Sequence, residues 1–261
     1  MARIEIADVK LIGKLVENDL KARYSGAALG LFWAYVQPLV TVLVFWYVFQ
    51  VGFRNPPVND VEYILWFAAG FIPWTFFSDG LTSSSNVFYE YSYLVKKMKF
   101  KVWQLPIVKV LSSFCIHFFL LTFVVAMYLL YGHQPCFAWI SVIYYSGCIM
   151  FLLVGNAFMV GALSVFFKDA SQLVNIILQI GFWLTPVFWS DESMGENVLR
   201  ILRLNPMHYV LQGYRDALIR GIPFWQEPIK DVIYFWVISI IINLIGLRIY
   251  KKLRVHFSDL L

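Results

Sequence analysis

The feature that most constrains this chain is a run of 58 residues, from Val110 to Phe167, without any Asp, Glu, Lys or Arg. A helix needs about 20 apolar residues to cross the hydrocarbon core of a bilayer, so this run is too long for one crossing and suits two. The sequence Gly-His-Gln-Pro at 132–135 favours a turn between them. Only 14% of the chain is charged, against about 25% in soluble domains. These features exclude an ordinary soluble enzyme and predict a polytopic membrane protein.

Further runs with few charges supply the other crossings. The second is interrupted by Asp79, and the sixth is short but is flanked by Lys230 and Arg248, whose long side chains can reach the membrane surface. We therefore expect an all-α integral membrane protein with six transmembrane helices, forming a single transmembrane domain over residues 1–261. The predicted spans are 27–53, 63–85, 108–131, 137–167, 170–189 and 231–250.

The distribution of Lys and Arg predicts the orientation, because cytoplasmic loops carry an excess of both. With both termini inside, fourteen of these residues lie on the cytoplasmic side and six outside, five of the six in one long loop. The net charge of +5 is then explained by membrane orientation and not by nucleic-acid binding. Residues 1–26 mix charges with apolar residues at roughly helical spacing, which predicts an amphipathic helix at the cytoplasmic interface and not a signal peptide.

The cytoplasmic segment 86–104 has two interpretations. From the pattern alone we favour positive charge that faces anionic lipid. The alternative is a short helix that docks into a cytoplasmic partner. Apolar residues recur in it at helical spacing and lysines fill the positions between them: Leu94, Val95, Met98 and Val102, with Lys96, Lys97, Lys99 and Lys101.

The external segment 190–230 is too apolar for a free loop. Asn205 followed by Pro206 is typical of a helix start, and Gly221 of a helix end. The predicted helix either lies flat in the interface or enters the outer leaflet as a re-entrant gate. Its apolar stripe consists of Met207, Val210, Leu211, Tyr214 and Leu218.

Motifs for catalysis and nucleotide binding are absent from the sequence. It has no G-x-x-x-x-G-K-[ST] loop, no H-E-x-x-H and no G-x-S-x-G, so we expect no bound cofactor, metal or catalytic residue in this chain. The external acids Asp191, Glu192 and Glu196 are expected to form a solvated loop. Asp79 is expected to cap a helix or to pair near the membrane interface.

Seven short motifs follow one another along this map of spans. They are Leu-Lys-Ala-Arg-Tyr at 20–24 with Leu-Gly-Leu-Phe-Trp at 29–33, Gly-Phe-Ile-Pro-Trp-Thr-Phe-Phe at 70–77, Asn86 to Phe100, Phe-Phe-Lys-Asp at 166–169, Leu-Thr-Pro-Val-Phe at 184–188, Asn-Pro-Met-His-Tyr at 205–209 and Tyr-Arg-Asp-Ala at 214–217. Because these motifs occur in this order, the sequence resembles the membrane permease of type-2 ABC exporters for polysaccharides and polyol phosphates. Such exporters transport O-antigen, capsule or teichoic acid. Lys101 stands where this family usually has Pro, and Lys168 where it has Arg.

The resemblance implies a complex of two copies of this chain with two cytoplasmic P-loop ATPase subunits, which bind Mg-ATP. The substrate would be a glycan on an undecaprenyl-type lipid, and the location the bacterial cytoplasmic (inner) membrane. It also implies that closure of the ATPase dimer pushes on the segment around 94–100 and on the N-terminal helix. The expected coupling residues are Leu94, Val95, Lys96, Lys97, Phe100 and Arg23.

Two further groups of residues follow as hypotheses. Aromatic rings can stack on sugars, so we expect a substrate path lined by Trp33, Tyr35, Trp46, Phe49, Trp74 and Phe77. The expected external gate contains Asn205, Pro206, Tyr209, Tyr214, Arg215 and Asp216.

Two other functions stay open. An exporter of drugs or lipids would share the same fold. A membrane-embedded enzyme acting on lipid-linked glycans would need a carboxylate pair or a metal-binding cluster at the membrane surface.

Overall fold

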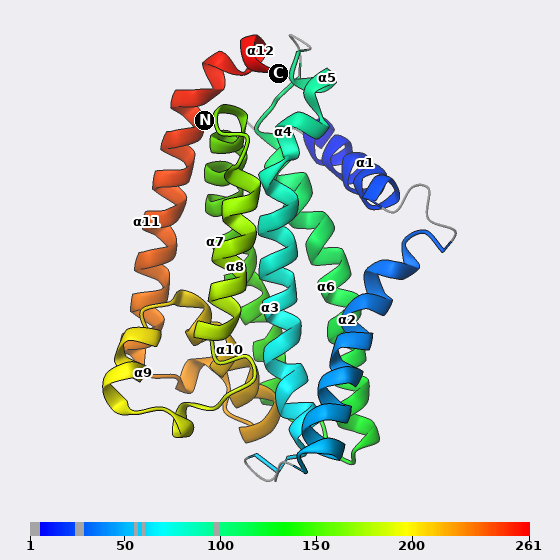
Figure 1. Cartoon of the computed structure of the whole chain (residues 1–261), viewed down its shortest axis with the longest axis vertical. Coiled ribbons are helices and arrows are strands. Elements are labelled where there is room, and N and C mark those ends of the chain that lie inside the picture. Colours follow the sequence, from blue (N-terminus) through cyan, green and yellow to red (C-terminus); the bar gives the residue numbers. More distant parts are fainter. Residues whose placement is uncertain (1–5, 24–28, 55–56, 59–60, 97–99) are drawn as a thin grey trace.

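The computed structural model describes residues 6–23, 29–54, 57–58, 61–96 and 100–261. These residues form a bundle of long helices that run roughly along one axis (Figure 1). In this part of the chain, extended pairing is limited to an isolated bridge between Val58 and Val61. The prediction of an all-α fold is confirmed.

Five helical segments of the described chain are long and apolar enough to cross a membrane. Each agrees with a predicted span to within a few residues, although the third begins earlier and the last is longer than expected. They are Phe32–Gly52, made of α2 (Phe32–Phe45) and the π-helical η1 (Trp46–Gly52); α3 (Tyr63–Ser85); α6 (Gln104–Leu130); Phe137–Phe166, made of η2 (Phe137–Ile140) and α7 (Ser141–Phe166); and Ile229–His256, made of α11 (Ile229–Leu253) and η6 (Arg254–His256).

The predicted span 170–189 is shorter in the structure. Helix α8 (Ala170–Leu184) has 15 residues, which is about 22 Å of helix against a hydrocarbon core of about 30 Å. It ends because Thr185 precedes Pro186 and adopts extended backbone, as residues before proline prefer. The chain then turns back to the bundle, where Val187 is fully buried.

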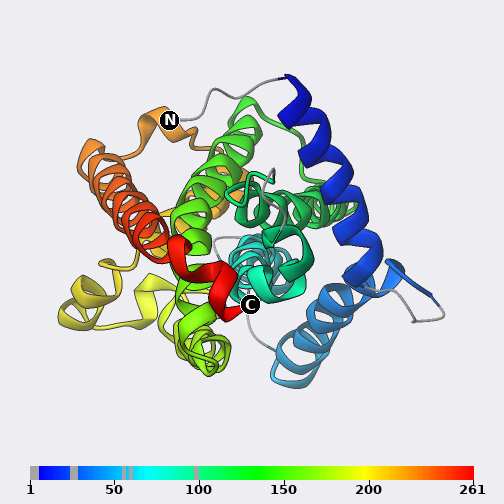
Figure 2. The same cartoon turned by 90° about the horizontal axis from the view of Figure 1, so that it is seen from above.

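Helix α3 is the centre of the bundle. It packs against α2, α6, α7, α8 and α10 and buries residues on all its sides. Seen along the bundle, α2 lies at one edge, where most of its surface is exposed, and α11 lies at another, packed against α7 (Figure 2).

The two ends of the bundle carry different short elements (Figure 1). At one, called here the α1 end, lie α1 (Ile6–Arg23), α4 (Val87–Glu90), α5 (Ser92–Val95) and α12 (Phe257–Leu260). At the other, the α10 end, lie η3 (Asp191–Ser193), α9 (Glu196–Leu202), α10 (Pro206–Arg215), η4 (Asp216–Arg220) and η5 (Phe224–Gln226).

The segment 86–104 does not form one helix. It consists of the single turns α4 and α5, separated at Tyr91, and α6 already begins at Gln104. Lys97, Met98 and Lys99 lie outside the described residues.

Candidate functional site

A charged cluster joins α1 to the bundle at the α1 end. It consists of Asp19, Arg23, Asp79, Glu90 and Lys109, which come from α1, α3, α4 and α6. The Lys109 ammonium lies 2.6 Å from Asp19 and also contacts Glu90. The Arg23 guanidinium lies 2.9 Å from Asp19 and 2.9 Å from Asp79. Of the two roles predicted for Asp79, a helix cap or a pair, the structure shows the ion pair.

The centre of the charged cluster is withdrawn from solvent. Asp19 is 1% exposed and Lys109 is 2% exposed, and the Tyr91 hydroxyl donates a hydrogen bond to Asp19 over 2.9 Å. Burial alone would raise the pKa of Asp19, but the charges of Arg23 and Lys109 outweigh it and the pKa lies below its usual value. Asp19 therefore carries its charge and holds α1 against α6.

A second contact fixes the first half of α1. Lys101, just before α6, and Gln104, the first residue of α6, donate hydrogen bonds to the Asp8 carboxylate over 2.8 and 3.0 Å. Together with Lys109 they connect both ends of α1 to α6. A displacement of α1 would therefore strain α6 at two points.

The predicted coupling residues divide into three groups. Arg23 belongs to the charged cluster. Leu94, Val95 and Phe100 are partly buried against a second hydrophobic cluster that includes Phe88 and Phe257. Lys96 is exposed, and Lys97 lies outside the described residues. Sequence reasoning missed Asp19, Glu90 and Lys109 as candidate functional residues, although an ionisable residue within a predicted span, such as Lys109 in 108–131, is a signal of function.

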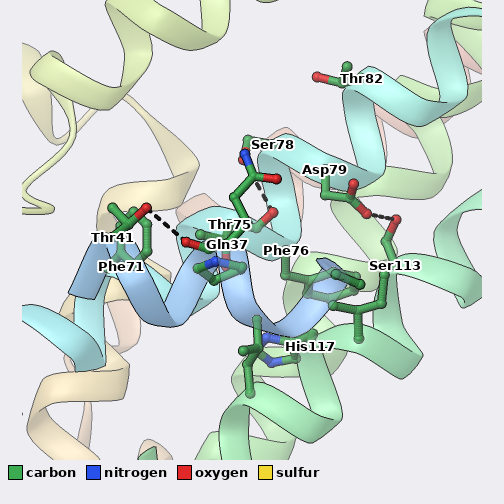
Figure 3. A pocket seen from close by; sticks show the side chains of 14 residues that line it. Gln37, Thr41, Phe71, Thr75, Phe76, Ser78, Asp79, Thr82, Ser113 and His117 are labelled. Atoms are coloured by element: carbon green, nitrogen blue, oxygen red, sulfur yellow. Dashed lines mark hydrogen bonds between the residues drawn. The ribbon is translucent and has the colours of Figure 1, made fainter. Parts of the chain in front are cut away.

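A polar groove lies between α2, α3 and α6 and has a volume of about 310 Å³. Figure 3 shows Asp79 and Ser113 joined by a hydrogen bond in it. Asp79 thus belongs to both the charged cluster and the groove. The polar side chains that line it include Gln37, Thr41, Thr75, Ser78, Asp79 and Ser113.

The six predicted path aromatics pack in separate groups within one chain. Tyr35 contacts Phe119 of α6, with 4.0 Å between ring centroids. Phe49 stacks on Tyr63 over 5.3 Å. Trp74 is buried. The remaining positions are as follows: Phe77 lies 5.9 Å from Trp74, Trp46 is half-buried and Trp33 is 46% exposed.

The α10 segment begins and ends as the sequence predicts. The Asn205 side chain accepts a hydrogen bond from the Met207 amide over 3.0 Å, and Pro206 is the first helical residue. Gly221 ends the segment with φ +67°, a left-handed conformation that glycine adopts without strain. The predicted apolar stripe is buried in the bundle.

Arg215 anchors the α10 segment to α3. Its guanidinium lies 3.6 Å from the centre of the Trp66 ring and donates a hydrogen bond to the Val187 carbonyl over 2.8 Å. It is 3% exposed. The predicted gate residue Asp216 begins the π-helical turn that follows.

A buried polar triad ties the same segment to α6 and α7. The Tyr214 hydroxyl lies 3.0 Å from His117 Nε2 and 2.6 Å from the Ser146 hydroxyl. The neighbouring Tyr209 hydroxyl lies 3.4 Å from that of Tyr144. His117 and Ser146 were missed in the sequence, because no motif connects residues so far apart in the chain.

The prediction of a solvated acidic loop is wrong for one residue. Glu192 and Glu196 are exposed, but Asp191 is half-buried and interacts with His208 and Gln212 over 3.1 and 2.7 Å. Burial would raise the pKa of Asp191, yet the hydrogen bond from His208 and further partners lower it. Asp191 therefore attaches the loop that precedes α9 to the helix α10.

Glu227 is expected to make the α10 end sensitive to pH. Burial, and then the neighbouring Asp216, raise its pKa from 4.5 to about 7. The unfolded chain loses this proton at a lower pH than the folded chain does. The contribution of Glu227 to the free energy of unfolding therefore decreases as pH rises from 4.5 to about 7. The protection of α10 amides from hydrogen exchange, measured relative to the unstructured chain at each pH, should therefore decrease over this range, and Glu227→Gln should reduce the change.

The exposed Glu196 provides the control for this prediction. Glu196→Gln should keep the wild-type pH profile. An unchanged profile in the Glu227→Gln variant would assign the pH response to other groups.

Comparisons with known proteins agree with this architecture. A family model described as ABC-2 type transporter matches residues 10–219. An O-antigen export system permease protein RfbA of Klebsiella pneumoniae is 26% identical over 254 residues, which are 96% of this chain and 95% of the relative. A protein of the same description from Myxococcus xanthus is 24% identical over 256 residues, which are 95% of this chain and 94% of the relative. Since the family match extends from α1 to η4, well over half of the sequence, this chain belongs to the ABC-2 type transporter family of membrane proteins.

Proposed function

We propose that this chain is the channel subunit of an ATP-driven exporter that moves a polysaccharide across the inner membrane. The observation that carries the proposal is the similarity to O-antigen export permeases over nearly the full length of both chains. Membership of the ABC-2 family makes the chain a multi-pass transport subunit and implies a partner ATPase subunit. Mg-ATP would bind to that partner.

In the membrane, the α1 end would face the cytoplasm. Lys101, Lys251, Lys252 and Arg254 lie at this end, as the excess of positive charge in cytoplasmic loops requires. Helix α8 would be a sixth membrane helix that crosses only part of the hydrocarbon core, since the chain turns back to the bundle after Leu184. The α10 segment would then lie within the outer leaflet as a re-entrant gate, anchored by Arg215.

The charged cluster would couple the ATPase to the bundle. The ATPase would contact α1 and the exposed surface of α4, α5 and Lys96. Movement of α1 would pull on α3 through Asp79 and on α6 through Lys109, because ion pairs connect these helices. A motion at the membrane surface would thereby reach the helices that line the polar groove.

Two copies of the chain would enclose the substrate path, and the substrate would be a glycan on an undecaprenyl-type lipid. The exposed faces of α2 and α8 carry large apolar side chains, among them Trp33, Val40, Ile177 and Trp183, that a second copy or lipid must cover. Rings that pack separately in one chain, such as Trp33 and Phe49, would meet their counterparts across this interface.

An exporter of drugs or lipids would have the same fold, but its substrates would be small molecules without a polysaccharide chain. The alternative of an embedded enzyme has less support. The matching family is one of transporters and not of enzymes.

Arg23→Gln tests the proposal in cells that lack the native copy of this chain. Loss of the Arg23–Asp79 pair should leave the ATPase bound and ATP hydrolysis intact, while surface polysaccharide falls at least tenfold. Lys21 lies on the same helix, 72% exposed in a surface pair with Glu17, and Lys21→Gln should export normally.

Three measurements decide the result: co-purification of the ATPase, ATP hydrolysis in nanodiscs, and surface polysaccharide. Wild-type cells that hold the complex but place no polysaccharide on their surface would contradict the polysaccharide substrate. Normal export by the Arg23→Gln variant would contradict the coupling role of the charged cluster but not the polysaccharide substrate.

A further inference from the structure

We infer that the polar groove between α2, α3 and α6 binds the hydroxyl groups of a neutral sugar unit of the exported polymer. The inference rests on the proposed function and adds a location and a chemistry to it. It differs from the aromatic path expected above, since hydroxyl, amide and carboxylate groups dominate the polar lining of the groove.

The position of the groove requires a polar occupant. Its walls come from three membrane-spanning segments, where unsatisfied polar groups are costly. Gln37 is exposed, and Thr75 and Ser78 are half-buried. Lipid tails cannot form hydrogen bonds with these side chains, whereas water or sugar hydroxyls can.

The hydrogen bonds within the groove leave mainly acceptors for a ligand. Thr75 donates its hydroxyl proton to the Ile72 carbonyl over 2.7 Å, and Ser78 donates to the Thr75 carbonyl over 3.2 Å. Thr41 donates to the Gln37 carbonyl over 3.0 Å, and Ser113 donates to Asp79. Each of these hydroxyls has thus used its one proton and can only accept further hydrogen bonds; Ser113 already accepts one from Arg23 over 3.4 Å, and the Gln37 amide still offers N–H donors.

An acceptor-rich wall selects a ligand that donates. Each sugar hydroxyl provides one donor, whereas the oxygens of an ionised pyrophosphate only accept. The Asp79 carboxylate would also repel an anion, and the Arg23 guanidinium beside it is engaged by Asp19 and Asp79. The groove therefore fits the neutral sugar and not the lipid pyrophosphate.

Size and shape agree with this assignment. The volume of about 310 Å³ is at the lower end of the range of about 300–1,000 Å³ for small-ligand sites. The rings of Phe71 and Phe76 also line the groove and offer apolar surface to the C–H face of a sugar.

Photo-crosslinking tests the site in the intact complex with its ATPase. Benzoylphenylalanine is placed at Gln37 in the groove, or at Thr122, which is exposed on α6 and outside the groove lining. The probe is the exported polysaccharide, tritium-labelled in its sugars and released from its lipid by mild acid. We expect label at position 37 and none at position 122, and excess inorganic pyrophosphate should not reduce it.

Matched variants keep the test independent of the bulky probe. Thr75→Val with Ser78→Ala removes two acceptors at nearly constant shape and should lower export at least tenfold, with unchanged ATPase binding. Ser83, on the same helix but outside the groove lining, donates to the Gly80 carbonyl, and Ser83→Ala should export normally.

The outcomes separate the two proposals. If wild-type complex exports polysaccharide while the double variant exports equally and position 37 remains unlabelled, the groove is not a sugar site. Loss of label with pyrophosphate would overturn the choice of a neutral sugar. Absence of polysaccharide export by wild type would instead contradict the proposed function.

Discussion

Lys109→Met is expected to destabilise the protein by up to about 3 kcal/mol, the lower end of the cost of an uncompensated buried charge, because it removes one of the two cations that pair with the buried Asp19 carboxylate. Asp19 is 1% exposed and would keep Arg23 as its remaining ion-pair partner within the charged cluster. The result should be visible as a lower unfolding temperature in detergent and as faster proteolysis of α1.

Two further variants make this prediction specific. Asp19→Asn combined with Lys109→Met should recover part of the loss, since neutral partners avoid the buried charge. Lys21→Met removes an exposed pair with Glu17 and should cost only about 0–1 kcal/mol. Equal unfolding temperatures for Lys109→Met and Lys21→Met would show that the buried pairs contribute little to attachment of α1.

Gly246→Ala is expected to disturb the packing of α11 on α7. A Cβ atom at Gly246 would overlap the backbone carbonyl oxygen of Gly155, which cannot move aside as a flexible side chain can. Overpacking of this kind costs about 1–3 kcal/mol and sometimes more. The opposite position gives the same expectation, because a Cβ at Gly155 would lie 2.6 Å from the Asn243 Cα atom.

Gly147 provides the matched control on α7. A Cβ there meets no atom within 4 Å, so Gly147→Ala should be neutral or should stabilise the helix by up to about 1 kcal/mol. Unfolding temperature and the yield of monodisperse protein measure both variants. A Gly246→Ala variant as stable as Gly147→Ala would show that the two helices can separate at little cost.

Local patterns in the sequence were enough to predict most of the long helices of this protein. Runs with few or no charges located α3, α7 and α11 to within a few residues, because charged side chains are costly in the hydrocarbon core and therefore rare there. The start and end of the α10 segment followed from Asn205, Pro206 and Gly221, since capping depends on neighbouring residues. Motif order along the chain pointed to the family before any contact was known.

The assembly of the candidate sites was decided by tertiary structure alone. Asp19 meets Lys109, and Arg23 meets Asp79, because α1 crosses the ends of α3 and α6; these two pairs join residues 90 and 56 positions apart. The polar groove depends in the same way on three helices whose hydroxyl groups look ordinary in the sequence. The physical reason is that periodicity and capping act within a few residues, whereas ion pairs and cavities depend on which helix faces meet.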